Sequence, residues 1–206
     1  MTSSKDVDRR AIPAERISLF TVPLKCAAAS EIGCGSLSKL LLLNLEEQPG
    51  VTGAWLNETG TILALIGNQG FRRDARLQAV KSAAEKRKIV ATEITGAARE
   101  RALQDFHSGK RWHRGAAVDE LSRTEAGIIA ARLVRRVKEK TPLPDDKSDG
   151  LRVAFAQAFE KCFSKGDVSE PRDELLRIGR EQLDSDATAA LQAAIAPGYR
   201  PLPGEE

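Results

Sequence analysis

Residues 34–66, CGSLSKLLLLNLEEQPGVTGAWLNETGTILALI, carry the pattern from which the fold is predicted. Leucine recurs every four residues within 36–48, and Pro-Gly ends the run, so this stretch is predicted to be a helix. The apolar runs 51–57 and 61–66 flank the turn sequence NETG, which is typical of a β-hairpin. The segment therefore predicts a helix followed by two paired strands.

The flanking segments extend this pattern in both directions. Within residues 16–24, Ile17, Leu19 and Thr21 alternate with Phe20 and Val22, which predicts a strand before the helix. Residues 74–86 have helical spacing, and residues 88–94, KIVATEI, are predicted to be a short strand. The resulting order, β-α-β-β-α-β, is that of a ferredoxin-like fold, in which two helices cover one face of a four-stranded antiparallel sheet. We therefore predict an α+β protein whose N-terminal module is ferredoxin-like.

The second half of the chain has helical patterns throughout, so we predict an all-helical C-terminal module. The expected helices are 96–109, 121–140, 151–163, 174–183 and 187–195. Ser122 and Glu125 have the spacing of a capping box at the start of the longest helix. The predicted domains are a flexible arm at 1–15, a ferredoxin-like domain at 16–95, and a helical domain with a flexible tail at 96–206.

The composition limits the class of protein. Of the 206 residues, 41% are apolar and 30% are charged, which is ordinary for a globular protein. The net charge of +3 does not favour a nucleic-acid partner. No apolar run approaches the length of a membrane span, and the polar N-terminus does not resemble a signal peptide, so we expect a cytoplasmic protein without a membrane partner. Three cysteines are too few for a disulfide framework.

Two of the cysteines frame the loop before the first predicted helix. Cys34 lies just before that helix, where the helix dipole favours a thiolate. Cys26 lies at the end of the preceding strand, and Gly33 and Gly35, which flank Cys34, would let the loop move or fold back. Two thiolates suit soft cations, Cu(I) and Hg(II) before Zn(II). The sequence leaves open whether the two sulfurs meet, and both cysteines could instead be inert core residues.

The stretch from Cys34 through PGV, the strand WLN and the third strand resembles the heavy-metal-associated domain of copper chaperones, copper ATPases and mercury-binding proteins. The segment LQAVKSAAEKRKIVATEI resembles the second helix and last strand of that family. The resemblance covers residues 16–95. In that family a Cys-x-x-Cys loop opens the first helix, and here Cys34 matches the first cysteine while Leu37 stands at the second. A metal site of that kind would require the loop to bring Cys26 back to replace the missing ligand.

The resulting functional prediction is a protein that binds or traffics a soft metal ion, of the copper or mercury class, through Cys26 and Cys34. The ion would pass to a protein partner by ligand exchange, and the helical module would supply the docking surface. Two alternatives remain open. One is a metal-free protein–protein adaptor of the same fold, and the other is a thiol redox sensor centred on Cys34.

Other polar and aromatic residues are assigned structural roles. We expect His107 and His113 at the surface near a turn, and Trp112 as an anchor for the linker, although the stretch around it could also clamp a phosphate or a base. The arginines of residues 132–140 are expected on a solvated helix face, and Cys162 in a core. The sequence contains no phosphate loop, nucleophile elbow or zincin helix, so no catalytic residue is predicted.

Overall fold

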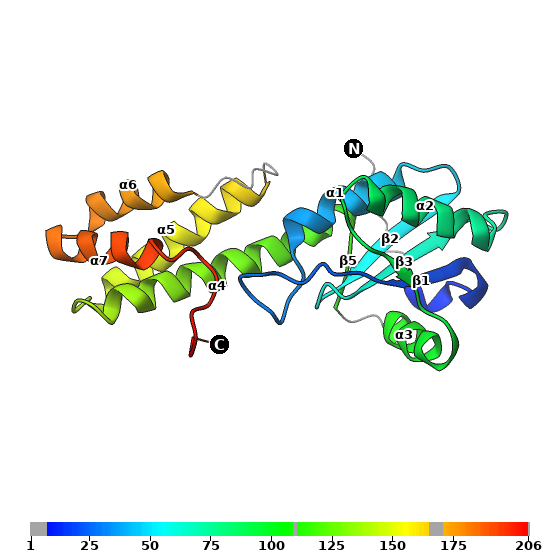
Figure 1. The fold of residues 1–206 in the computed structure, drawn as a ribbon, viewed down its shortest axis with the longest axis horizontal. Coiled ribbons are helices and arrows are strands. Elements are labelled where there is room, and N and C mark those ends of the chain that lie inside the picture. The colour runs from blue at the N-terminus through cyan, green and yellow to red at the C-terminus, as the bar shows by residue number, and fades with distance from the viewer. Residues whose placement is uncertain (1–7, 109–110, 165–170, 206) are drawn as a thin grey trace. The chain divides into compact units, whose positions relative to one another are not determined.

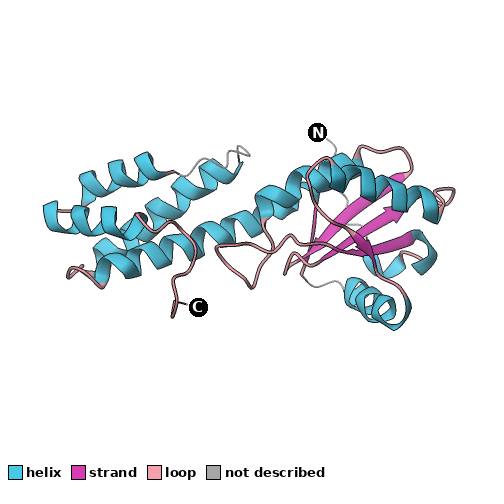
Figure 2. Cartoon of the chain, in the orientation of Figure 1, coloured by secondary structure: helices cyan, strands magenta, loops and turns pink. Residues whose placement is uncertain are grey.

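The computed structural model of the chain forms two compact units. The residues it describes are 8–108, 111–164 and 171–205. Unit 1 comprises Met1–Lys25 and Leu37–Val118, and unit 2 comprises Cys26–Ser36 and Asp119–Glu206. The described strands belong to unit 1, whereas the regular elements described in unit 2 are helices (Figures 1 and 2).

Unit 1 is built on a five-stranded antiparallel sheet with the strand order β4-β1-β3-β2-β5. The strands are β1 (Ile17–Thr21), β2 (Val51–Asn57), β3 (Ile62–Gly67), β4 (Thr92–Glu93) and β5 (Trp112–Arg114). The central pair, β1 and β3, runs in register from Ile17↔Ile66 to Thr21↔Ile62. The remaining strands pair outward from this centre, β4 on β1, and β2 on β3 with β5 beyond it.

Helices cover both faces of the sheet. Figure 1 shows α1 (Gly35–Glu46) and α2 (Arg73–Glu85) on one face and α3 (Gly96–Ser108) on the other. The core under α3 joins alternate residues of β1, β2 and β3 to the apolar side of α3, and includes Leu19, Trp55, Ala64, Leu103 and Phe106. Strands buried on both faces are continuously apolar rather than alternating, which explains the sequence ILALI in β3.

The predicted fold class, a ferredoxin-like βαββαβ module followed by an all-helical module, is wrong. The chain does not leave the sheet after β4, because β5 follows α3 and pairs with β2 as a fifth strand. Helix α3, predicted to belong to the helical half, instead covers the second face of the sheet. The physical reason is an aromatic cluster: Phe106 contacts Trp55 and Trp112 edge to face, with ring centroids 5.6 and 5.0 Å apart.

The predicted hairpin is confirmed as β2 and β3. Asn57 organises its turn, since Oδ1 accepts hydrogen bonds from the backbone of Thr61 and Ile62, both at 2.9 Å. Gly60 has φ +69°, a backbone conformation that favours glycine. The local sequence therefore determines this turn.

The first helix buries most of the expected leucines but leaves the first of them, Leu37, exposed. Leu41, Leu42 and Leu45 are fully buried, as the helical spacing predicts. Leu37, expected on the same stripe, is 51% exposed, and Leu40 is 45% exposed. The start of α1 therefore presents two large apolar side chains to solvent.

Unit 2 contains four described helices that pack on one another. They are α4 (Asp119–Lys138), α5 (Asp145–Ser164), α6 (Arg172–Gln182) and α7 (Ser185–Ile195). Helix α4 packs against α5 and α7, and α6 closes the group by contacting the same two helices (Figure 1). Ile129, Leu133 and Val137, which recur every four residues along α4, are buried. None of the described helices combines the length and apolar composition that crossing a membrane requires.

Two arginines of α4 are buried, contrary to the predicted solvated face. Arg132 donates from Nη1 to the backbone oxygen of Tyr199 at 2.8 Å. Arg136 donates to both carboxylate oxygens of Glu205, at 2.8 and 2.7 Å, and to the backbone oxygen of Gly198 at 2.7 Å. The segment that follows α7 is therefore fixed to α4 by charged hydrogen bonds.

The predicted domain boundaries at residues 15 and 95 stay predictions. The two compact units are defined by contacts within each unit, and this does not show which parts fold independently. Of the predicted arm, residues 1–7 lie outside the described residues. Arg9–Ala11 and Ala14–Arg16 form short 3-10 helices, and Ile12 between them is buried in the core under α3.

Candidate functional site

The segment that begins unit 2, Cys26–Ser36, is a loop that folds back on itself. The backbone nitrogen of Cys26 donates to the oxygen of Ile32 at 2.8 Å, and the nitrogen of Ile32 donates to Ala29 at 3.2 Å. The nitrogen of Ala28 also donates to the Cys26 sulfur at 3.2 Å. These bonds place the backbone of Ile32, two residues before Cys34, beside that of Cys26.

The Cys26 side chain is buried against a carboxyl group of α4. Cys26 is 2% exposed, and its thiol donates a hydrogen bond to Glu125, which is 7% exposed. Burial, together with the hydrogen bond and negative charge of Glu125, raises the pKa of Cys26 to about 12. At neutral pH the residue is therefore a neutral thiol.

Glu125 is a candidate site residue that was not predicted from the sequence. Its predicted role in a capping box with Ser122 is wrong, because α4 begins at Asp119 and both side chains are buried within the helix. Glu125 precedes Ile129 and Leu133 at intervals of four residues, which places it in the apolar stripe. A carboxyl in an apolar stripe was the sequence signal for a buried acid.

One oxygen of the Glu125 carboxyl lacks a hydrogen bond within the described part of the chain. Burial raises its pKa, and the hydrogen bond from the Cys26 thiol offsets this in part. Its Oε2 is buried and has no hydrogen-bond partner among the residues that the structure describes. A buried polar oxygen without a partner is costly, so this position is suited to a ligand or a proton.

Cys34 lies at the other end of the same loop. It is 9% exposed and immediately precedes Gly35, the first residue of α1. Its sulfur lies 3.4 Å from the Ser36 hydroxyl oxygen, a contact in which either group can donate. Both predicted ligands thus lie in one folded loop of one unit.

The described residues contain no group of three or more His, Cys, Asp and Glu side chains that could hold a metal ion. A metal at this loop would therefore rely on fewer protein ligands, as two-coordinate Cu(I) and Hg(II) do. A soft-ion site at this loop would require the thiols of Cys26 and Cys34 to bind the same ion, with the Glu125 carboxyl beside Cys26.

The two histidines belong to unit 1 and are half-buried. The Nε2 atom of His107 lies 3.1 Å from the backbone oxygen of Ile12, so it contributes to the attachment of the N-terminal segment. His113 lies in β5 and is paired in register with Leu56. Neither position resembles a metal site.

Trp112 and Cys162 have clear structural positions. Trp112 is buried, and its Nε1 donates to Asp105 at 3.0 Å, so its ring anchors β5 to α3 and is not free to stack on a base. Cys162, predicted to be a core residue, is only partly buried on α5.

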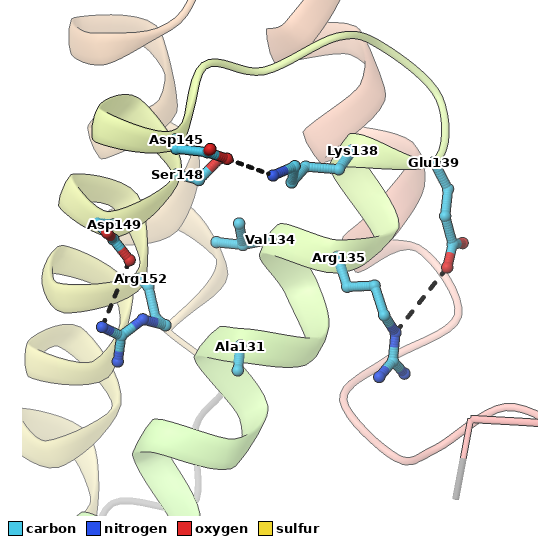
Figure 3. A pocket seen from close by; sticks show the side chains of 9 residues that line it. All are labelled: Ala131, Val134, Arg135, Lys138, Glu139, Asp145, Ser148, Asp149 and Arg152. Atoms are coloured by element: carbon cyan, nitrogen blue, oxygen red, sulfur yellow. Dashed lines mark hydrogen bonds and ion pairs between the residues drawn. The ribbon is translucent and has the colours of Figure 1, made fainter.

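A second feature of unit 2 is a groove of about 640 Å³ between α4 and α5 (Figure 3). Three cations line it, and each faces an acid: Lys138 with Asp145 at 3.0 Å, Arg152 with Asp149 at 3.5 Å, and Arg135 with Glu139 at 3.9 Å. Since these charges neutralise one another, the groove offers little to a charged ligand.

Comparisons with known proteins identify no relative. The chain matches no protein-family model, and no curated protein or solved structure is significantly similar to it. The resemblance to the heavy-metal-associated domain therefore stays a prediction.

Proposed function

We propose that this protein binds a soft, thiophilic metal ion of the copper or mercury class at Cys26 and Cys34, and passes it to a protein partner. The observation that carries the proposal is the buried thiol–carboxyl pair of Cys26 and Glu125, which joins α4 to a loop that also holds Cys34. The resemblance of residues 16–95 to heavy-metal-associated domains supports the same chemistry.

Metal capture at this loop would begin from neutral Cys26. A soft cation forms its bond to sulfur as the S–H bond breaks, and the proton passes to the Glu125 carboxylate or to solvent. In its ionised form Glu125 would accept this proton, and the raised pKa of its carboxyl favours holding it. Arg132 lies within electrostatic reach of Cys26 and would stabilise the thiolate.

The test is an anaerobic titration of the reduced protein with Cu(I), in competition with a chromophoric chelator. The variants are Cys26→Ser, Cys34→Ser and Glu125→Gln, with Cys162→Ser as the matched control because it removes the third thiol. We expect each cysteine of the loop to be required. Loss of the carboxylate beside a ligand should weaken binding about 10- to 100-fold.

The Cys162→Ser protein should bind Cu(I) as tightly as wild type. The proposal fails if wild type binds no ion more tightly than the Cys26→Ser/Cys34→Ser double variant. It also fails if Cys162→Ser loses Cu(I) binding while Cys26→Ser and Cys34→Ser keep the affinity of wild type.

A metal-free adaptor is the second candidate, favoured by the exposed Leu37 and Leu40 at helical spacing on α1. An adaptor would bind its partner equally well with Cys34→Ser and would lose binding with Leu37→Ser/Leu40→Ser. The redox alternative needs a reactive thiolate, and the raised pKa of Cys26 works against a resting Cys26 thiolate.

The proposed setting is the cytoplasm, where free thiols persist. In this proposal the helices of unit 2 carry the contact with the protein partner, since they hold the loop that presents the ion.

A further inference from the structure

A pocket in unit 1 lies where the end of β3 meets the start of β1. Its volume is about 330 Å³, and its lining includes Arg16, Arg76, Asn68, Gln69 and Phe71. This volume is at the small end of the range for ligand sites. Two guanidinium groups and two side-chain amides thus line one small hollow.

Arg76 is a buried cation with neutral partners. It is 6% exposed, and it donates to the Ser18 hydroxyl at 2.9 Å and to the backbone oxygens of Glu15 at 2.8 Å and Phe71 at 2.5 Å. Burial lowers its pKa from the ordinary guanidinium value, and the charge of Glu93 offsets this only in part. A buried charge without a directly bonded counter-charge is costly.

Arg16, which is half-buried, adds a second guanidinium. Its Nε donates to the backbone oxygen of Gly67 at 2.8 Å. Within residues 8–108, 111–164 and 171–205, neither Arg16 nor Arg76 forms an ion pair with a carboxylate. The pocket differs in this respect from the α4–α5 groove, whose cations are all paired.

The polar side chains beside the arginines leave hydrogen-bond donors. Asn68 uses its Oδ1 to accept from the nitrogen of Gly70 at 3.1 Å, and its amide nitrogen can act only as a donor. Glu15 also lines the pocket and contributes one negative charge against the two positive charges. The lining therefore has excess positive charge and surplus donors.

We propose that this pocket binds the phosphoryl group of a small molecule, with Arg16 and Arg76 as its principal contacts. Two guanidinium groups match the charge and the three oxygens of a phosphoryl dianion. A single carboxylate would neutralise only one of the two guanidinium groups. This site lies in unit 1 and is independent of the metal proposed for the loop of unit 2.

The test is calorimetric titration of the full chain with inorganic phosphate at low ionic strength, with acetate as the comparison anion. Wild type should bind phosphate with a Kd of about 1 mM or tighter. Arg16→Gln should weaken binding about tenfold or more, because it removes one charged hydrogen-bond donor. Arg135→Gln removes the same charge from the groove of paired ions and should leave binding unchanged.

A second variant, Arg16→Lys, distinguishes loss of a phosphate contact from misfolding. Arg16→Lys keeps the charge and loses the planar fork, so it should also weaken phosphate binding, but less than Arg16→Gln. The proposal is overturned if wild type binds no phosphate, if both Arg16 variants bind it as well as wild type, or if acetate binds as tightly. If Arg135→Gln weakened phosphate binding as much as Arg16→Gln does, phosphate would be attracted by the overall positive charge and not by this pocket. That result would also overturn the proposal.

Discussion

At the scale of single residues, the least expected feature is an acid buried beside a thiol. Burial gives Glu125 a raised pKa, so the folded protein holds this proton more tightly than the unfolded chain. The stability that results is fully present below the ordinary carboxyl pKa and is lost as pH rises through the raised value. The neutral thiol of Cys26 stabilises the folded protein in the same way at higher pH. This stabilisation is lost as pH rises from 9 toward about 12.

Glu125→Gln should therefore stabilise the protein at pH 8 and change little at pH 4. The amide imitates the protonated carboxyl, and each tenfold change in proton affinity on folding corresponds to about 1.4 kcal/mol. Urea unfolding at both pH values measures the difference. A variant that lost equal stability at both pH values would show that Glu125 is ionised and satisfied in the folded state.

Arg136 is the residue on which the C-terminal segment depends. Arg136→Met should lower the free energy of unfolding by about 3 kcal/mol, because it leaves Glu205 and several backbone oxygens without their donor. Arg135→Met, one position away and half-exposed, should change it by less than about 1 kcal/mol. Equal effects of the two substitutions would contradict the assigned role of Arg136.

The Arg136–Glu205 pair also has a defined pH dependence. Arg136 holds the pKa of Glu205 at about 2, below its ordinary value. The contribution of the pair is therefore present above the ordinary carboxyl pKa and is lost as pH falls toward 2.

At the scale of elements, two helix glycines make a matched test of packing. A Cβ added to Gly179 of α6 would lie 2.4 Å from Cδ2 of the buried Leu191 on α7, whereas one added to Gly127 of α4 would meet no atom within 4 Å. Gly179→Ala should therefore destabilise the protein by about 1 kcal/mol or more through overpacking. Gly127→Ala should stabilise it by about 0.5–1 kcal/mol through helix propensity.

Thermal unfolding of the two alanine variants and wild type provides the measurement. If both substitutions stabilise the protein, α6 and α7 do not pack as closely as described.

Element types were largely predictable, because helical spacing and turn chemistry are local. The hairpin of residues 51–67 and the helices of the second half follow directly from such patterns. Strand β5 was missed because three residues carry no periodicity, and its pairing with β2 depends on the contact of Trp112 with Phe106. The start of α4 was misplaced because Ser122 and Glu125 imitate a capping box.

At the scale of the whole molecule, the arrangement of elements was less predictable than their existence. Covering the second sheet face with α3 requires contacts between distant segments, such as Trp55 with Phe106. The continuous apolar run of residues 62–66 was a sequence signal of a strand buried on both faces, which the ferredoxin-like prediction did not use.

The candidate site shows the same division between local and distant information. The sequence led to the prediction of a site at Cys26 and Cys34, and the fold-back of the loop between them is observed. It did not place Glu125 beside Cys26, since that contact joins the loop to α4 only in the folded unit.

The central claim is that two thiols of one loop share a soft metal ion, and the affinity of Cys34→Ser for Cu(I) tests it most directly. The account predicts that this variant binds Cu(I) roughly tenfold or more weakly than Cys162→Ser, which loses a thiol outside the loop. Equal affinities of the two variants would contradict a shared site.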